Sequence, residues 1–352
     1  MEKNLKIFKT PISEKEVLIG PDVEKDIIIM AIESSCDETA CAVVKNGREV
    51  LANVVASQIK THQAFGGVVP EVAAREHMDA INLVIAEAFD KSGLKPDEIT
   101  AFAATVGPGL VGSLLVGLNA SKALSITHDK PFIGVNHLNA HVCANYIDTD
   151  LKPPFIALLV SGGHTQVIKV DNYLKQTIVA ETIDDAIGEA YDKVARLIGL
   201  PYPGGPNLDK LAKIGNKNAY KLPQAKVGEN EFSFSGLKTA VLQLCQRIKK
   251  ETGTIPKEDI AACFQECVSD TLVKKVLNIA KANGIRTLAL AGGVAANSEI
   301  RRKFFDLENE GYKVFAPQMK YCTDNASMVG SSAYFLANTM DNLTQEVFSR
   351  MK

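Results

Sequence analysis

The chain has 352 residues, of which 46% are hydrophobic and 23% are charged, and its formal net charge is −2. This length accommodates two domains, and the composition is that of an ordinary globular protein that neither requires nor excludes a nucleic-acid partner. Seven scattered cysteines without a Cys-x-x-Cys pair argue against a disulfide framework and against a cysteine zinc site. No apolar run has the length of a membrane span or a signal peptide, so we expect a cytoplasmic protein.

The first half of the chain alternates strands and helices after a polar extension over residues 1–25, to which the sequence assigns no role. Asn46-Gly47 between two apolar runs is a strong hairpin signal. Hydrophobic patterning predicts strands over 26–33, over 40–45 and through Val55, a helix over 71–91, a strand over 100–106, a helix over 110–127 and a strand over 131–135.

The second half repeats this order, which predicts a duplicated β-β-β-α-β-α fold of the α/β class. Its expected elements are strands from Phe155, to Val170 and through Glu181, helices over 185–198, 237–250 and 258–283, a strand over 287–291, a helix over 297–307 and a strand over 312–315. We expect an N-terminal lobe over 26–152 and a C-terminal lobe over 153–352, whose final helix is able to pack back on the first lobe. Two such lobes match the actin-like superfamily (ASKHA, RNase H-like), in which nucleotide phosphates lie in a cleft between the lobes.

Glycines interrupt the pattern at three places. Ser161-Gly162-Gly163-His164 breaks an apolar strand, and it is either a phosphate-binding hairpin or an ordinary tight turn. Gly292-Gly293 ends a strand and precedes a helix, which suits a nucleotide's polar groups, unless the segment is a packing turn with Asn297 as the helix N-cap. Gly107 to Gly112 matches G-x-G-x-x-G, but no ribose-binding carboxylate follows, so we expect only a tight turn before a helix.

Two histidines lie one helical turn apart in His137-Leu138-Asn139-Ala140-His141. The spacing resembles the zinc-protease pattern H-E-x-x-H, but Leu138 replaces the glutamate that acts as general base. A third ligand must come from elsewhere, and Asp324 is a candidate, with the N-cap of the final helix as its alternative role. A His2Asp set leaves coordination positions open and suits iron(II) or zinc.

Seven ordered motifs together resemble the bacterial tRNA adenosine threonylcarbamoyltransferase family (TsaD), long labelled O-sialoglycoprotein endopeptidase. They are IESSCDET from Ile32, the HLNAH helix, VSGGHTQ from Val160, GEAYDKVARLIGLPYPGGP from Gly188, FSFSGLK from Phe232, GGVAAN from Gly292 and CTDNASM from Cys322. The resemblance runs from about Ile27 to near the C-terminus, and residues 1–25 lie outside it.

This resemblance implies an acyltransferase that moves a threonylcarbamoyl group from threonylcarbamoyl-adenylate to the exocyclic amine of adenosine 37, in tRNAs that read codons beginning with A. It implies one divalent metal per subunit on His137, His141 and Asp324. It implies as partners tRNA, a catalytically incompetent paralogue (TsaB type) and a P-loop ATPase (TsaE type), but no membrane. The implied substrate contacts are Val160, Ser161, Gly162, Gly163, His164, Asp192, Gly205, Asp209 and Asn297.

The general base is not indicated by any motif. Asp37 and Glu38, in the first polar loop, are candidates by position, and the alternative is a solvated turn or a spacer in a phosphate loop. We expect Asp184 and Asp185 to cap the helix that follows them, and Cys263 and Cys267 to pack as small hydrophobic residues. Five lysines between Lys210 and Lys226 are either a tRNA-binding stretch or a solvated face.

Three other classes of function stay open at this point. A metalloprotease would need a base beside the histidines. A metal-free nucleotide-binding switch or scaffold of the actin or chaperone type would bind no metal at His137 and His141. A sugar kinase would need a catalytic aspartate and a sugar pocket, neither of which the sequence identifies.

Overall fold

The computed structural model describes residues 4–335 and 343–350. Two compact units make up the chain: the first contains Met1–Pro153, Asp171–Gln176 and Pro317–Lys352, and the second contains Pro154–Val170 and Thr177–Ala316. Each unit has its own β-sheet and its own hydrophobic core.

A five-stranded sheet in the order β5-β4-β3-β6-β7 forms the centre of the first unit. Antiparallel pairing joins β3 to β4 and β4 to β5, whereas β6 pairs parallel to both β3 and β7. The strands are β3 (Ile28–Glu33), β4 (Glu38–Lys45), β5 (Glu49–Ser57), β6 (Ala101–Gly107) and β7 (Phe132–Asn136), close to the predicted positions. Nearly every residue of β3, β6 and β7 is buried, because helices cover both faces of the sheet.

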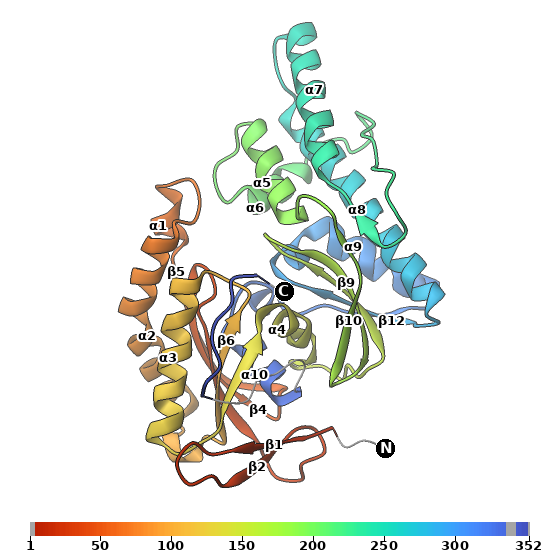
Figure 1. Cartoon of the computed structure of the whole chain (residues 1–352). Helices are drawn as coiled ribbons and strands as arrows, with labels where there is room; N and C mark the ends of the chain where they lie inside the picture. The colour runs from red at the N-terminus through yellow and green to blue at the C-terminus, as the bar shows by residue number, and fades with distance from the viewer. Residues whose placement is uncertain (1–3, 336–342, 351–352) are drawn as a thin grey trace. The chain divides into compact units, whose positions relative to one another are not determined.

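Alternate residues of β4 show what covers each face. Cys41 and Val43 belong to the core beneath α2 (Pro70–Ser92) and α3 (Val111–Thr127), whereas Ala42 and Val44 pack with α10 (Ala326–Phe335). Figure 1 shows α2 and α3 on one side of the sheet, and α10 with α4 (His137–Cys143) on the other. The close approach of α10 requires Gly330, where an added Cβ would lie 2.7 Å from Val44 Cγ2.

Residues 4–25 contain a β-hairpin, where the sequence analysis placed no element. Its strands β1 (Lys6–Lys9) and β2 (Glu16–Ile19) pair antiparallel, and Phe8 and Ile19 are buried. Asp129 accepts hydrogen bonds from the backbone N–H groups of Ile12 at 2.9 Å and Ser13 at 3.1 Å. The sequence did not predict these short strands, because most of their residues are charged or exposed and so form no clear hydrophobic pattern.

The second unit repeats the strand order of the first. Its sheet runs β11-β10-β9-β8-β12-β13, with β8 antiparallel to β9 and parallel to β12. The strands are β8 (Phe155–Val160), β9 (Thr165–Asn172), β10 (Lys175–Thr182), β11 (Glu231–Phe232), β12 (Thr287–Ala291) and β13 (Lys313–Phe315). Apart from the added edge strand β11, this is the order of the first sheet, and the predicted duplication is confirmed.

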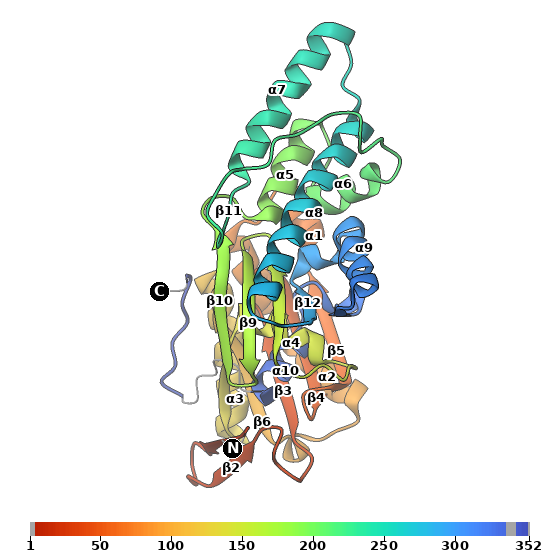
Figure 2. The same ribbon diagram turned by 90° about the vertical axis from the view of Figure 1, so that its right-hand side faces the viewer.

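The helices of this unit are α5 (Ile187–Leu197), α6 (Gly204–Ala212), α7 (Ser235–Thr252), α8 (Lys257–Ala282) and α9 (Ser298–Asp306). Figure 2 shows α5, α6 and α7 beyond one end of the strands. Helix α6 was not predicted, because it begins with Gly204-Gly205-Pro206, which is typical of a loop.

Short elements complete both units: α1 (Ile59–Gln63) and the 3₁₀ helices η1 (Pro96–Glu98), η2 (Ala144–Tyr146), η3 (Gly293–Ala296), η4 (Leu307–Glu310) and η5 (Met319–Tyr321). Within residues 4–335 and 343–350, no helix combines the length and apolar character needed to cross a membrane.

Candidate active site

Two histidines of α4 and an aspartate before α10 meet in the first unit. His141 Nε2 lies 3.1 Å and His137 Nε2 lies 3.6 Å from Asp324 Oδ1, and one ligand atom from each residue falls within 4.8 Å of the other two. Asn136 starts α4 as its N-cap, with its side chain accepting from Leu138 N and Asn139 N, so the helix that carries both imidazoles begins directly after β7. Two imidazole nitrogens and one carboxylate oxygen converging at this spacing fit a divalent metal.

Asp324 does not cap the final helix. Asn325 Oδ1 accepts the hydrogen bond from Met328 N at 3.2 Å, so the neighbouring residue takes the capping role. The Asp324 carboxylate is thereby left to face the histidines. Their positive charge outweighs the effect of burial and lowers the pKa of Asp324 to about 2.

A second carboxylate, that of Glu33, contacts the Nδ1 side of the His137 ring. Glu33, the last residue of β3, is fully buried, and its Oε2 lies 3.2 Å from His137 Nδ1. The same carboxylate accepts from Ser35 N at 2.6 Å and from the Thr105 hydroxyl. Because a carboxylate only accepts, it selects the His137 tautomer that carries its proton on Nδ1 and leaves Nε2 free for a metal.

Glu33 was not among the predicted site residues, although a charged residue at the end of a buried strand is a signal for such a role. Burial opposes a charge on His137, but Asp324 and Glu33 outweigh burial and raise the pKa of His137 to about 9. A metal at this site must therefore displace a proton at neutral pH.

The polar loop after β3 lies beside this cluster. Asp37 and Glu38 are half-buried, so the solvated-turn alternative does not describe them. Burial, with the charges of Asp324 and Asp37, raises the pKa of Glu38 to about 10. Glu38 is thus protonated at neutral pH in the metal-free protein and poorly suited to accept a proton there.

The glycine turn before α3 braces this loop, as the tight-turn prediction requires. Leu110 N donates to Ser35 O at 2.8 Å, and a Cβ on Gly109 would lie 2.6 Å from the same oxygen. Only a glycine permits this approach.

In the second unit, the Ser161-to-His164 segment forms the turn between β8 and β9. Ser161 N donates to His164 O at 2.9 Å, and His164 N donates to Ser161 Oγ at 3.1 Å. Gly162 and Gly163 are exposed, with no atom within 4 Å of where a Cβ would stand. The first turn of α5 abuts this loop, because a Cβ on Gly188 would lie 2.6 Å from Ser161 O. An open glycine turn beside a helix N-terminus is a favourable place for an anion.

The second glycine turn lies at the same end of the sheet. Ala291 of β12 pairs with Leu159 of β8, and Gly292 has φ 86° and follows directly. A Cβ on Gly292 would lie 2.4 Å from Val160 O, so glycine is required there too. Val160 itself is fully buried, backbone included, so the structure exposes no part of it to a ligand.

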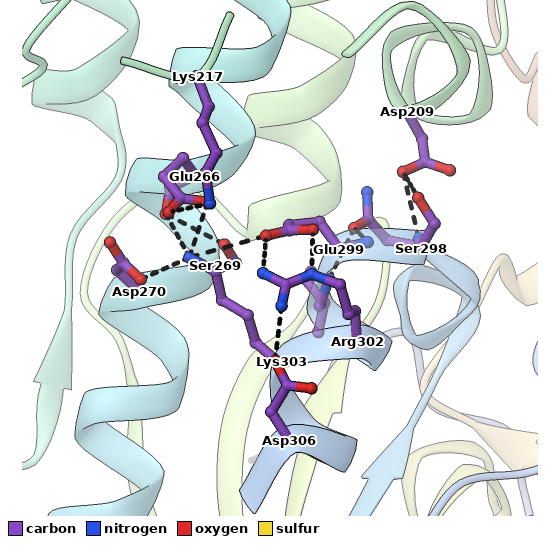
Figure 3. A network of polar contacts seen from close by, with 12 residues as sticks. Asp209, Lys217, Glu266, Ser269, Asp270, Ser298, Glu299, Arg302, Lys303 and Asp306 are labelled. Atoms are coloured by element: carbon purple, nitrogen blue, oxygen red, sulfur yellow. Dashed lines mark hydrogen bonds and ion pairs between the residues drawn. The ribbon is translucent and has the colours of Figure 1, made fainter. Parts of the chain in front are cut away.

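The four remaining substrate candidates form a polar framework between helices. Asp192 Oδ1 accepts from Gly204 N and Gly205 N at 2.9 and 3.1 Å, which holds α6 to α5. Asp209 accepts from the Ser298 hydroxyl at 2.7 Å, as Figure 3 shows.

Asn297 is the N-cap of α9, as one of its two interpretations proposed. Its Oδ1 accepts from Glu299 N and Ile300 N, and its Nδ2 donates to Gln265 Oε1 at 2.9 Å.

A network of charged side chains next to this framework joins α8 to α9 (Figure 3). Lys303, only 11% exposed, lies 2.9 Å from Glu266 and 2.5 Å from Asp270. Lys217 also pairs with Glu266, at 3.0 Å, and Lys213 pairs with Asp209, at 3.8 Å, so two of the five lysines considered for tRNA binding have partners within the unit.

Two expectations for neighbouring residues are wrong or only partly met. Asp184 does not cap α5; it accepts from Phe234 N at 2.8 Å and from the Ser233 hydroxyl, and so holds the start of α7. Asp185 pairs with Lys193 at 2.8 Å instead of capping. Cys263 is buried as expected, but Cys267 is only half-buried.

A family model described as tRNA N6-adenosine threonylcarbamoyltransferase (TsaD) matches residues 49–331. The chain belongs to the TsaD family. A relative of that name from Clostridium perfringens is 53% identical over 312 residues, which are 88% of this chain and 92% of the relative. One from Clostridioides difficile is 51% identical over 314 residues, covering 88% and 93%. The family resemblance drawn from the seven motifs is confirmed.

The TsaD-family chain also resembles solved structures of low sequence identity. Full-length HypF in its phosphate- and nucleotide-bound form has a TM-score of 0.62 at 15% identity, with 89% of this chain covering 47% of that one. Component A of the (R)-2-hydroxyglutaryl-CoA dehydratase of Acidaminococcus fermentans has a TM-score of 0.50 at 16% identity, covering 88% and 97%. Identities this low show the fold alone, and the predicted actin-like class is confirmed.

Proposed function

We propose that this chain transfers the threonylcarbamoyl group of threonylcarbamoyl-adenylate to the exocyclic amine of adenosine 37 in tRNAs that read codons beginning with A, releasing AMP. The observation that carries the proposal is the convergence of His137, His141 and Asp324 in a chain of the TsaD family. The donor is a mixed anhydride that is already activated, so the protein needs to orient the amine, hold the phosphate and accept a proton.

We infer that His137, His141 and Asp324 hold one divalent metal, iron(II) or zinc. The donor set fits, since both histidines direct Nε2 toward Asp324 Oδ1 and Glu33 fixes the tautomer of His137. When bound, such a metal supplies a Lewis acid for a carbonyl or phosphoryl oxygen. The leucine at position 138 removes the base that a metalloprotease would need.

The glycine loop Ser161–His164, together with the first turn of α5, is the proposed phosphate site. Its exposed glycines leave room for the donor's phosphate close to backbone N–H groups. Asp192, Gly205, Asp209 and Asn297 act by shaping the neighbouring framework, because their side chains or N–H groups already have partners within the unit.

Proton transfer is assigned to the loop after β3. As the amine nitrogen of adenosine bonds to the carbamoyl carbon, the bond to the phosphate oxygen breaks and AMP leaves with that electron pair. The amine then gives up one proton, which Asp37 accepts. Glu38, whose pKa is raised to about 10, is suited to donate a hydrogen bond instead.

The proposed partners are tRNA, a catalytically incompetent paralogue and a P-loop ATPase, and the proposed location is the cytoplasm. Exposed apolar side chains on α2 and α3 support a protein partner on that face of the first unit. Met78 is 65% exposed, Leu83 is 70% exposed and Leu115 is 42% exposed. Large apolar side chains gathered on neighbouring helices are typical of interaction surfaces.

The test is transfer of radiolabelled threonine to unmodified tRNA, with supplied threonylcarbamoyl-adenylate and the candidate partners. Label is expected in tRNA with the wild-type protein and none with His141→Ala. Absence of label with the wild type, while the same partners support transfer by another member of the family, would refute the proposed reaction.

A further inference from the structure

The loop that carries Asp37 and Glu38 is held by a buried histidine of α2. His77 lies in the first half of this helix, and its imidazole is fully buried. Its Nε2 lies 3.0 Å from the carbonyl oxygen of Cys36, and its Nδ1 lies 2.7 Å from the hydroxyl oxygen of Thr39. The two contacts therefore bracket Asp37 and Glu38 on either side.

The chemistry of these partners fixes the tautomer of His77. A carbonyl oxygen only accepts, so Nε2 must carry the proton, and Nδ1 then accepts from the Thr39 hydroxyl. Burial lowers the pKa of His77, which keeps the ring neutral and this pattern intact. Each nitrogen of the ring has one partner that suits it.

The position of His77 on its helix is unusual for a polar residue. The buried stripe of α2 consists of Ala73, His77, Ile81, Val84 and Ala88, so an apolar side chain would pack there without needing hydrogen bonds. A polar side chain in such a stripe costs stability unless both nitrogens are paired.

A second contact ties the same loop to the same helix. Gln58 N donates to Asp37 O at 2.9 Å, and Gln58 Nε2 donates to Ala73 O, one turn before His77, at 3.3 Å. The Cys36 carbonyl is thus hydrogen-bonded to a side chain of α2, and the Asp37 carbonyl is linked to α2 through Gln58. Of the two, only the Cys36 carbonyl is held directly by a side chain, so His77 is the contact that substitution can remove.

We propose that His77 is a positioning residue that fixes Asp37 and Glu38 through the Cys36 carbonyl and the Thr39 hydroxyl. The inference rests on the proposed function for its effect on catalysis, but its structural content is independent of it. Because a misplacement of about 1 Å in a catalytic group can cost about 100-fold in rate, loss of both contacts should lower kcat by roughly 10- to 100-fold. The KM for the adenylate should not change, because the proposed phosphate loop belongs to the other unit.

Three variants test this inference. His77→Phe keeps the ring and removes both contacts, whereas His77→Gln retains an N–H donor at the position of Nε2. Val84→Ala is the matched control, since it weakens the same buried stripe without touching the loop. We expect kcat to decrease in the order wild type, Gln, Phe at unchanged KM, with Val84→Ala close to wild type after correction for unfolded protein.

Hydrogen exchange of residues 34–39 in the full chain gives a readout that needs no substrate. Faster exchange in His77→Phe than in Val84→Ala at equal thermal stability is expected. Equal exchange in those two variants would overturn the inference, as would a kcat for His77→Gln as low as that of His77→Phe. If the wild type transfers nothing, the proposed reaction fails, while the exchange comparison still decides whether His77 holds the loop.

Discussion

Metal binding at His137, His141 and Asp324 should compete with a proton on His137. Burial disfavours the charged imidazole, yet Asp324 and Glu33 raise the pKa of His137 to about 9. A metal binds only the neutral ring, so the apparent affinity should fall about tenfold for each pH unit below that value. Between pH 9 and pH 7 the expected loss is therefore about 100-fold.

Glu33→Gln separates the two effects of the Glu33 carboxylate. Without its charge the pKa of His137 falls, so the affinity should depend less on pH in the neutral range. The variant also keeps one acceptor oxygen in place of two, and Ser35 N, the Thr105 hydroxyl and His137 compete for it, so His137 favours the tautomer with the proton on Nδ1 less strongly. At pH 9, where wild-type His137 is largely neutral, the loss of this orientation should weaken binding by roughly 10- to 100-fold. The difference from wild type should shrink as the pH is lowered to 7.

The assay is a zinc titration against a competing chelator of known affinity at each pH. Thr105→Val is the matched control, since it removes a hydroxyl that donates to Glu33 but keeps both carboxylate charges. Its affinity should follow the same slope as wild type. A wild-type affinity independent of pH, or a Glu33→Gln protein with the full wild-type slope, would refute the assignment of the raised pKa to these two carboxylates.

Three further outcomes are expected. In the metal-free protein the pKa of His137 is raised from 6.5 to about 9, so protonated His137 stabilises the fold. This contribution is fully present below about pH 6.5 and is lost as the pH rises through about 9. The thermal unfolding temperature should therefore fall over this range, and an unfolding temperature independent of pH would contradict the prediction. Asp37→Asn should abolish most turnover while leaving zinc affinity unchanged, and undiminished turnover would remove Asp37 as the base. Gly163→Ala should change the unfolding free energy by less than about 0.5 kcal/mol, because the added Cβ meets open space, but it should raise the KM for the adenylate. Gly188→Ala should destabilise the protein, because its Cβ would clash with Ser161 O. Equal stability of these two glycine variants would argue against the packing of α5 on the loop.

What the sequence predicted well depends on short-range patterns. The strands of both sheets, except the two-residue edge strand β11, and the long helices follow from hydrophobic periodicity. The histidine pair follows from one-turn spacing on a helix. The duplicated order was visible because each copy begins with two strands joined by a polar loop. These features are decided within ten or twenty residues of chain.

The residues that the sequence missed or misjudged depend on contacts far along the chain. Glu33 and His137 are 104 positions apart, and His77 and Cys36 are 41 apart. Asp184 was expected to cap α5 because the helix lies next to it, but its actual partners are about fifty residues away at the start of α7. Local capping rules fail where a tertiary contact offers the carboxylate better donors.

The repeated strand order explains why both candidate sites form at strand ends. In the first unit, Glu33 ends β3 and His137 follows β7; in the second, Ser161 follows β8 and Gly292 follows β12. In the first sheet β3, β6 and β7 run parallel to one another, and in the second sheet β8 runs parallel to β12, so the loops that leave their carboxyl ends gather at one edge of each sheet. The two copies of the fold differ in the side chains at this edge of the sheet: the first unit has imidazoles and carboxylates, and the second has glycine turns. In the proposed function, proton and metal chemistry belong to one copy of the fold and anion binding to the other, so Asp37→Asn and Gly163→Ala should alter kcat and KM separately.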